Sequence, residues 1–257
     1  MDLGLSGRRC LVTGASRGIG LATARALVAE GAEVFLTARG EDELARVATE
    51  TGAAGHVALD ITAPDAPERL LAETGPLGVL VNNAGTSQVR PLKELTDEEW
   101  QAQWELNVMA PMRLMRAAAP GMAERGWGRI VNVSSSSGKR PSLTNVAYSV
   151  TKAAQLSLSR AFADSYAARG LLVNAVTPGV VDTGLWLDPG GLADQVAAAQ
   201  GISREEALDG AGGKPPLGRF GTKEEIAAVI VFLCSERAGN VLGAAWSVDG
   251  GAVPTIL

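Results

Sequence analysis

Tyr148 and Lys152 stand four residues apart in segment 147–152 of the chain. On a helix, this spacing places a phenol and an ammonium group on the same face. A cation near a phenol stabilises the phenolate, so we expect Lys152 to lower the pKa of Tyr148 from about 10 toward neutral pH. Such a phenol is suited to donating a proton to a substrate oxygen or accepting one from it. The chain has only two tyrosines, the other being Tyr166, so few residues compete for this role.

A run of four serines, Ser134 to Ser137, precedes this pair and is followed by Gly138. The apolar stretch 129–134 leads into the run and is predicted to be a strand. A serine hydroxyl at the end of that strand is suited to hold a substrate carbonyl beside the phenol. The run itself does not distinguish one of the four hydroxyls from another.

The segment Thr-Gly-Ala-Ser-Arg-Gly-Ile-Gly at positions 13–20 lies between a predicted strand and a predicted helix. A turn of this kind presents backbone N–H groups and a helix N-terminus to a phosphate, and its glycines let a pyrophosphate approach the backbone. We therefore expect it to bind a dinucleotide. The residues predicted to do so are Gly14, Ala15, Ser16, Arg17, Gly18, Ile19 and Gly20.

The second predicted strand is followed by Arg39, at the place where folds that bind NAD(H) have an acid. Arg39 and Arg17 are suited to bind a 2′-phosphate, because guanidinium groups pair with phosphate in bidentate geometry. The pattern favours NADP(H) as the cofactor. NAD(H) stays the alternative, in which Arg39 is a solvated surface residue.

The composition excludes several other chemistries. The 257 residues contain one histidine, His56, and two cysteines, Cys10 and Cys234, so we expect no metal site. His56 lies in a predicted strand, which makes a Ser-His-Asp hydrolase a poor fit. The net charge of −5 disfavours nucleic acid and anionic membranes as partners. With no signal peptide and no apolar run of membrane length, the sequence predicts a cytoplasmic protein.

Short apolar runs alternate with amphipathic stretches along almost the whole chain. Strands are predicted at 10–13, 34–37, 56–59, 77–81, 129–134, 171–176 and 244–248, and helices at 18–30, 41–51, 64–74, 97–123, 147–169 and 223–234. Strands that alternate with crossover helices form a parallel sheet covered on both faces. We expect an α/β fold of one domain, 1–257, with a Rossmann-type, doubly wound, seven-stranded parallel sheet. Residues 183–216 interrupt the alternation, with only weakly helical pieces expected at 192–200 and 203–208, and are expected to form a substrate lid.

In their order, and over essentially the whole chain, these motifs resemble the short-chain dehydrogenase/reductase family in its shorter, single-domain branch. The resemblance implies that Tyr148 acts as general acid or base and that Lys152 holds the nicotinamide ribose. In that family the catalytic serine lies thirteen residues before the tyrosine and three before a glycine, which selects Ser135. Asn107 would kink its helix and anchor a water-mediated proton relay to Lys152. The hydride comes from the cofactor.

The resemblance also implies cofactor contacts outside the glycine-rich segment. Asp60 and Ile61 follow the third predicted strand and would contact the adenine, although a helix cap explains the aspartate equally well. The other residues that the resemblance assigns to the cofactor are Asn82, Ala84, Gly85, Tyr148, Lys152, Pro178, Gly179, Val181 and Thr183. The C-terminal run 248–251 matches the family's interface strand, which implies a homotetramer or a homodimer.

The substrate is expected to be a ketone, aldehyde or secondary alcohol of moderate size, chosen by the loops 86–92 and 138–146 and by the lid. The apolar run 185–187 at the start of the lid would pack either on an apolar substrate or on the body of the protein. β-Ketoacyl-carrier-protein reductases are a natural comparison within the family, although the lid here looks longer than theirs. In that comparison an acidic carrier binds basic residues near the active-site entrance, and the residues expected there are Arg125, Arg129 and Arg169.

Two other functional classes fit the same fold. A non-catalytic nicotinamide-binding sensor is expected to lack the tyrosine or the lysine, and this chain has both. A lyase-type relative such as a dehalogenase is expected to have a disrupted glycine segment, and Gly14, Gly18 and Gly20 are intact. The sequence therefore predicts an NADP(H)-dependent oxidoreductase acting on a carbonyl or secondary alcohol, with the sensor as the alternative.

Overall fold

Seven parallel strands form one sheet in the order β3-β2-β1-β4-β5-β6-β7. The computed structural model describes residues 1–254 of the chain. The strands are β1 (Arg9–Thr13), β2 (Glu33–Ala38), β3 (Gly55–Ala58), β4 (Val79–Asn82), β5 (Gly128–Val133), β6 (Leu171–Pro178) and β7 (Ala245–Val248). This order confirms the predicted doubly wound fold. The direction of strand addition reverses between β1 and β4, and ligands of such sheets bind there, beyond the carboxyl ends of the strands.

The central strands are apolar on both faces because helices cover both. All residues of β4 and β5 are buried, which fits the continuous apolar runs seen in the sequence. The register aligns Val12, Val81 and Val131 across the three central strands. The loops that follow β1, β4 and β5 therefore open side by side at one edge of the sheet.

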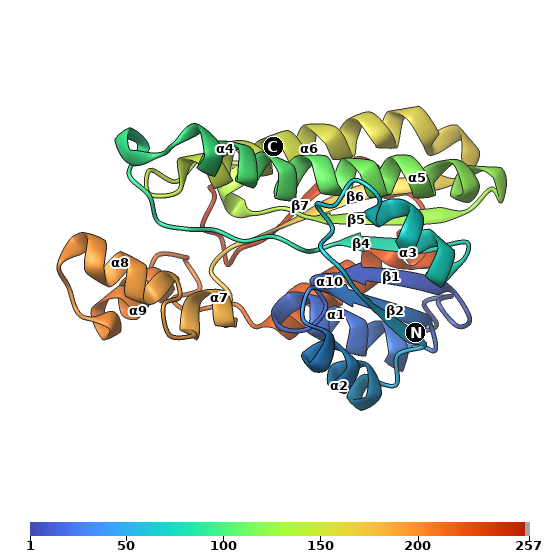
Figure 1. Cartoon of the computed structure of the whole chain (residues 1–257), viewed down its shortest axis with the longest axis horizontal. Helices are drawn as coiled ribbons and strands as arrows, with labels where there is room; N and C mark the ends of the chain where they lie inside the picture. Colours follow the sequence, from blue (N-terminus) through green and yellow to red (C-terminus); the bar gives the residue numbers. More distant parts are fainter. Residues whose placement is uncertain (255–257) are drawn as a thin grey trace.

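Helices pack on both faces of the sheet (Figure 1). One face carries α1 (Gly18–Ala29), α2 (Glu41–Thr51) and α10 (Lys223–Cys234), and the other carries α3 (Ala66–Thr74), α5 (Ala110–Glu124) and α6 (Val146–Tyr166). Each face has its own core, with Leu27 and Ile230 in one and Leu70 and Met115 in the other. Short 3₁₀ turns lie at Leu92–Glu94, Ser136–Gly138, Ala167–Arg169 and Glu236–Ala238.

The predicted helix 97–123 consists of three parts. It begins as α4 (Asp97–Trp104), where Thr96 and Glu99 form a capping box. A π-helical segment, Glu105–Met109, follows and leads into α5. Such a segment inserts one residue into the helical repeat and is frequent at functional sites. Asn107 lies at its centre, so the helix is irregular at the residue where the resemblance implies a kink.

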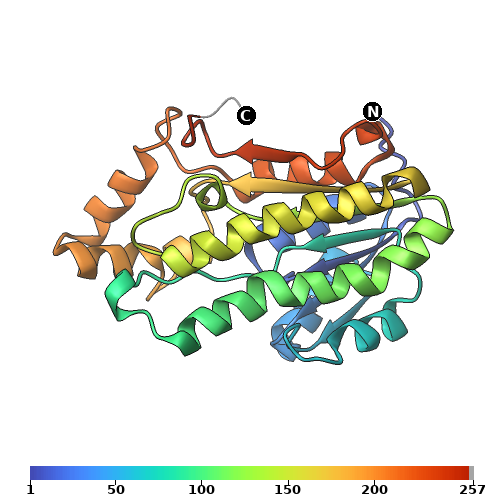
Figure 2. The same ribbon diagram turned by 90° about the horizontal axis from the view of Figure 1, so that it is seen from above.

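The segment 183–216 forms three short helices rather than a plain loop. They are α7 (Gly184–Leu187), which was not expected, α8 (Leu192–Gln200), found at its expected position, and α9 (Arg204–Gly212), which runs four residues further than expected. In Figure 2 this segment extends past the carboxyl end of β6. Trp186 packs edge-to-face on Phe220, with ring centroids 5.7 Å apart. Within the apolar run 185–187, Trp186 therefore fastens the segment to the body of the protein.

Candidate active site

Tyr148 and Lys152 lie on one face of α6, as expected. The helix begins at Val146, two residues before the tyrosine, so the spacing of four residues brings both side chains to the same side. The Lys152 ammonium lies 5.6 Å from the centroid of the Tyr148 ring. It donates a hydrogen bond to the carbonyl oxygen of Val133, the last residue of β5, at 2.8 Å. The helix is thereby attached to the strand that ends in the serine run.

Ser135 is the serine that meets the phenol. Its hydroxyl faces the Tyr148 side chain, whose pKa it lowers against the larger effect of burial, and accepts the Ser137 N–H at 3.1 Å. Ser134 instead donates to the Lys152 carbonyl oxygen at 2.9 Å, which holds the end of β5 against α6. The structure thus brings together Tyr148 and the serine that the family spacing selects.

Gly138 permits this close approach of the serine turn to α6. A Cβ at this position would lie 2.9 Å from both the carbonyl carbon and the carbonyl oxygen of Lys152, and 3.2 Å from the Ala153 nitrogen. These distances are shorter than the 3.5–4.0 Å or so of an ordinary contact. A side chain here would push the turn that carries Ser135 away from the helix.

Burial dominates the electrostatics of the pair. Lys152 is only 2% exposed, and its ammonium also donates to Gln155 Oε1 at 3.2 Å. Burial lowers the pKa of Lys152 from 10.5 to about 7. Burial also raises the pKa of Tyr148 above its usual value of 10.0, and the hydrogen bond with Ser135 offsets this only in part.

The expectation that Lys152 lowers the pKa of Tyr148 is therefore wrong for this structure. The ammonium is directed to Val133 and Gln155, and burial disfavours its own charge. Helical spacing predicts which side chains share a face, but not which acceptor a long side chain reaches. Gln155 was not among the expected site residues, although its position three residues after Lys152 on the same helix is a signal that could have found it.

Asn107 reaches the same region from the π-helical segment. Its side chain is buried, and Nδ2 donates to Gln103 Oε1 at 2.8 Å and to Thr151 Oγ1 at 3.2 Å. Its Oδ1 accepts no hydrogen bond from the described residues. A Cβ on Gly85 would lie 3.0 Å from this oxygen and 3.4 Å from Lys152 Nζ. Asn107 Oδ1 and Lys152 Nζ therefore both lie beside Gly85.

Asn83, which the sequence analysis passed over, ties the loop after β4 to the glycine-rich turn. Its side chain donates to the carbonyl oxygens of Thr13 at 2.9 Å and Gly14 at 3.1 Å. The N–H groups of Asn83 and Ala84 both donate to Thr13 Oγ1 at 3.0 Å. The expected residue, Asn82, turns the other way and donates to Asn132 Oδ1 at 2.8 Å. Successive strand residues face opposite sides, which is the signal that separates the two asparagines.

The glycine-rich turn and the start of α1 fit a pyrophosphate. Gly14 and Gly18 have positive φ angles of 63° and 60°, which other residues rarely adopt. A Cβ on Gly20 would overlap the Gly14 carbonyl oxygen, so turn and helix pack backbone against backbone. Arg17 is the N-cap, and no side chain of the described residues caps α1, whereas α4, α9 and α10 begin with capping boxes. The first N–H groups of α1 are left to an external acceptor.

The residues expected near the adenosine lie around the ends of β2 and β3. Arg39 is exposed, and its charge contributes to a lowered pKa of Asp60, whose carboxylate is stabilised mainly by hydrogen bonds from the backbone and side chain of Thr62. These bonds, at 2.9 and 2.8 Å, place Asp60 in a local turn, and it does not form the helix cap that was its alternative explanation, because Asp65 is the N-cap of α3. Ile61 is 7% exposed and packs in the core of the face covered by α3 and α5.

The other expected cofactor residues lie where β6 leaves the sheet. Pro178 ends the strand, and a Cβ on Gly179 would lie 2.9 Å from the Asp249 Cα. Val181 is buried and forms an isolated bridge to Gly221. The next residue to reach the glycine-rich turn is Thr183, whose Cγ2 lies 3.4 Å from the Cβ position of Gly18. In the turn itself, Ala15 is buried, and Ser16 and Ile19 are half-buried.

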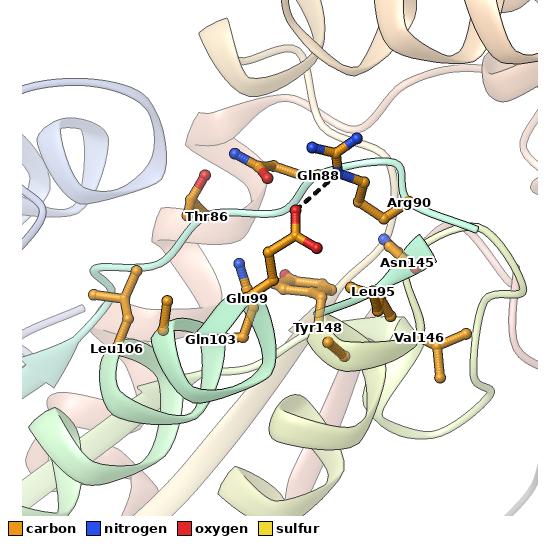
Figure 3. A pocket seen from close by; sticks show the side chains of 12 residues that line it. Thr86, Gln88, Arg90, Leu95, Glu99, Gln103, Leu106, Asn145, Val146 and Tyr148 are labelled. Carbon is orange, nitrogen blue, oxygen red and sulfur yellow. Dashed lines mark hydrogen bonds and ion pairs between the residues drawn. The ribbon is translucent and has the colours of Figure 1, made fainter. Parts of the chain in front are cut away.

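A cavity of about 200 Å³ lies beside Tyr148, between the loop after β4, α4 and the start of α6 (Figure 3). Arg90 Nε donates to the Glu99 carboxylate at 2.9 Å, and Figure 3 shows both polar ends on the same side of the cavity. The other polar side chains that line it are Thr86, Gln88, Gln103 and Asn145. Gln88, Arg90 and Asn145 belong to the two loops expected to choose the substrate, whereas Glu99 and Gln103 of α4 were not expected.

Arg125, Arg129 and Arg169 lie at the opposite edge of the sheet. Arg129 is the second residue of β5, whose far end carries the serines, and the other two follow the last turns of α5 and α6. Arg129 is 5% exposed, and its Nε donates to the Ser235 carbonyl oxygen at 3.2 Å. The expectation that these arginines flank the active-site entrance is wrong, because parallel strands all begin at one edge and end at the other.

Two classes of site are not found among residues 1–254. No three His, Cys, Asp or Glu side chains in that range gather in a way that would hold a metal ion. Within the same range, no helix has the length and apolar character needed to cross a bilayer. His56 pairs with Glu41 at 3.0 Å on the surface, and Cys10 and Cys234 are buried free thiols.

Known proteins with similar sequences include several reductases and a dehydrogenase. A family profile described as short chain dehydrogenase matches residues 8–188. L-xylulose reductase of Mus musculus is 36% identical over 260 residues, which cover 99% of this chain and 100% of the mouse protein. The 3-oxoacyl-acyl-carrier-protein reductase of Salmonella typhimurium is 34% identical over 254 residues, covering 97% of this chain and 98% of that protein. Identity alone does not choose between a sugar and an acyl substrate.

A solved structure with the same fold gives a comparison for the whole chain. L-sorbose reductase from Gluconobacter frateurii, complexed with NADPH and L-sorbose, matches with a TM-score of 0.91 and 37% identity. The match covers 100% of both chains. The seven-stranded sheet, the glycine-rich turn and segment 183–216 therefore all lie within the compared region.

Proposed function

The chain belongs to the short-chain dehydrogenase/reductase family and is an NAD(P)-dependent oxidoreductase of carbonyl or alcohol groups, and from this premise we propose that it reduces a small polyhydroxylated ketone with NADPH. The observation that carries this proposal is the group of polar side chains, Gln88, Glu99 and Gln103, in the otherwise largely apolar cavity beside Tyr148. Its volume of about 200 Å³ is below the roughly 300–1,000 Å³ of sites for drug-sized ligands, which favours a small substrate. The donors and acceptors of Gln88, Glu99 and Gln103 suit a substrate with several hydroxyl groups.

Two of the relatives support a substrate of this kind. The mouse protein is named for L-xylulose, and the Gluconobacter structure contains L-sorbose with NADPH. Both compounds are ketones that carry hydroxyl groups on neighbouring carbons. The acyl-carrier-protein reductase is about as similar in sequence, so the choice of a sugar-like ketone rests on the cavity and not on identity.

The preference for NADPH over NADH rests on Arg17 and Arg39. Both are exposed, one in the glycine-rich turn and one directly after β2, where an acid would repel a 2′-phosphate. The proposed cofactor contacts are the ones expected from the sequence other than Asn82, whose side chain faces Asn132, with Asn83 added as the residue that holds the two loops together. The uncapped start of α1 would receive the pyrophosphate.

Reduction of the ketone needs a hydride and a proton. The bound dinucleotide supplies the hydride. Tyr148 donates the proton to the carbonyl oxygen, and its raised pKa keeps the phenol protonated until that step. Ser135 hydrogen-bonds the same oxygen and stabilises the negative charge that develops on it.

Lys152 restores the proton to Tyr148. Because its pKa is about 7, the buried ammonium is able to release a proton near neutral pH, and a bridging water would carry that proton to the phenolate left after turnover, since Lys152 Nζ itself donates to Val133 and Gln155. Asn107 lies against the same point, where its Oδ1 and Lys152 Nζ both approach Gly85. This carboxamide is placed to join the relay that leads from the lysine.

The proposal is tested by comparing kcat/KM for L-sorbose, L-xylulose, acetoacetyl-CoA and cyclohexanone, followed by the absorbance of the reduced nicotinamide. We expect the two ketoses to be the best substrates and NADPH to be preferred over NADH. Acetoacetyl-CoA as the best substrate would make the protein an acyl reductase. Tight NADPH binding without turnover of any compound would favour the non-catalytic sensor.

A variant of the cavity separates substrate recognition from the reaction. Glu99→Gln removes a charge and keeps the capping box, because glutamine also accepts the Thr96 N–H. We expect the KM for the ketoses to rise about tenfold, the equivalent of about 1.4 kcal/mol or one hydrogen bond to a charged group. The KM for cyclohexanone should not change. Glu98→Gln, exposed on the same helical turn, is the matched control.

A further inference from the structure

Arg17 joins the glycine-rich turn to the lid segment. Its guanidinium Nη1 donates to Asp188 Oδ2 at 2.9 Å, across 171 positions of the sequence. The two side chains are 70% and 52% exposed, so the pair lies at the surface and is accessible to a ligand. Thr183, at the start of the same segment, also approaches the glycine-rich turn, since its Cγ2 lies 3.4 Å from the Cβ position of Gly18.

Asp188 occupies a central place in the lid segment. It is the C-cap of α7, and its carboxylate lies over Gly184, where a Cβ would overlap it. The Asp188 carbonyl oxygen accepts the Gly191 N–H at 2.9 Å, just before α8. Arg204, the first residue of α9, donates to the Leu187 carbonyl oxygen at 2.6 Å. A displacement of residues 187–188 would therefore affect the contacts of all three helices of the segment.

The same guanidinium has two suitable partners. A carboxylate and a phosphate both accept the parallel N–H donors of an arginine, and they compete for them. A phosphate monoester carries up to two negative charges, against one for the carboxylate. The 2′-phosphate of NADP(H), if held by Arg17, displaces Asp188 from the guanidinium Nη1 that it now occupies.

We propose that Asp188 is a determinant of cofactor choice that acts through Arg17, so that binding of a 2′-phosphorylated nucleotide releases the lid segment from the glycine-rich turn. This inference rests on the proposed preference for NADPH. The coupling is reciprocal, because a contact that opposes phosphate binding is itself opposed by the phosphate. An NADH molecule, which lacks that phosphate, leaves the pair in place.

Equilibrium binding of two nicotinamide-free probes tests the competition. Adenosine 2′,5′-bisphosphate carries the 2′-phosphate, and adenosine 5′-monophosphate lacks it. Asp188→Asn keeps the shape of the side chain and removes its charge, and it should tighten binding of the bisphosphate about 2- to 5-fold, the range given by exposed ion pairs. Binding of the monophosphate should not change. Asp194→Asn is the matched control, since Asp194 pairs with Arg204 inside the same segment at 2.9 Å.

Trypsin cleavage after Arg204 measures release of the lid segment directly. In the wild-type protein the bisphosphate should speed this cleavage and the monophosphate should not. In Asp188→Asn the cleavage should be fast without any nucleotide. A wild-type rate that the bisphosphate leaves unchanged would overturn the proposed coupling.

Arg17→Gln distinguishes failure of this inference from failure of the proposed cofactor. If Arg17→Gln binds the bisphosphate as well as the wild-type protein does, Arg17 does not hold the 2′-phosphate, and the cofactor assignment fails together with the competition. If Arg17→Gln binds it weakly but Asp188→Asn binds it like the wild-type protein, the competition alone is refuted. Support for the inference requires that Asp188→Asn has no effect in the Arg17→Gln background.

Discussion

Gly138→Ala should separate the serine from the tyrosine without removing either. The added Cβ would lie 2.9 Å from the Lys152 carbonyl group, so the serine turn must move back by about 0.5 Å to restore an ordinary contact. Both atoms that it meets belong to backbone in the middle of α6, which cannot yield easily. The turn that carries Ser135 is therefore the part that moves.

The size of the effect follows from this displacement. A shift of 1 Å in a reacting group costs up to about a hundredfold in rate, so about 0.5 Å predicts roughly a tenfold lower kcat. Overpacking also destabilises the fold by about 1–3 kcal/mol, which lowers Tm by about 2–4 °C for each kcal/mol in a chain of this size. The KM for NADPH should change little, because the turn does not belong to the glycine-rich segment.

The assay is steady-state reduction of L-sorbose with thermal unfolding of the same samples. Gly210→Ala is the control, since nothing lies within 4 Å of its Cβ position in α9 and alanine favours a helix by about 0.5–1 kcal/mol. It should retain kcat and raise Tm slightly. A Gly138→Ala protein with wild-type kcat would show that the contact between the serine turn and α6 does not set the geometry of the reaction.

Three further predictions concern the site. Tyr148→Phe should lower kcat by about 10²- to 10⁴-fold, because the proton donor is lost, and leave NADPH affinity nearly unchanged in a fluorescence titration; wild-type turnover would remove Tyr148 from proton transfer. Between pH 7 and 10.5 the unfolded chain holds a proton on Lys152 that the folded chain has lost, so the contribution of this residue to the free energy of unfolding rises with pH. The excess stability of Lys152→Met over the wild type should therefore shrink by up to about 1.4 kcal/mol per pH unit in urea unfolding across this window, and parallel profiles would contradict the lowered pKa. Asn83→Leu leaves the carbonyl oxygens of Thr13 and Gly14 without their donor, so it should cost about 1–3 kcal/mol of stability and weaken NADPH binding, and an unchanged nucleotide affinity would show that the clamp does not shape the turn.

Element boundaries were predictable where the sequence carries explicit end signals. The helices Glu41–Thr51, Leu192–Gln200 and Lys223–Cys234 lie at their predicted positions. Gly52 and Gly201 end the first two with positive φ, and Thr222 caps the third. Helix ends marked by such residues can be predicted from the neighbouring sequence alone, without the rest of the fold.

The contacts of the site were less predictable because they depend on distant segments. Two adjacent asparagines look alike in the sequence, yet only Asn83 faces the glycine-rich turn, because the pleat of β4 sends Asn82 to the other side. The pairing of Arg17 with Asp188 has no local signal at all. The direction of the Tyr148 pKa likewise depends on burial, which spacing along a helix does not reveal.

The position of Arg129 within its strand was already evidence against the expected location of this residue. Arg129 was expected near the active-site entrance, although it opens a strand whose other end carries the serines. In a parallel sheet, position along a strand already tells which edge a residue occupies. A residue that opens a strand of this sheet therefore lies far from an active site at the carboxyl ends of the strands.

The order in which the strands join the sheet has a consequence for how the protein is made. From β4 onward, each new strand adds beside the one before it, in the sequence β4, β5, β6, β7. A chain emerging from the ribosome is thus able to extend the sheet at one growing edge without displacing any strand already in place. The glycine-rich turn and the serine turn are synthesised before the helices of segment 183–216. The nucleotide-binding half of a nascent chain therefore stays uncovered by that segment until the segment has left the ribosome.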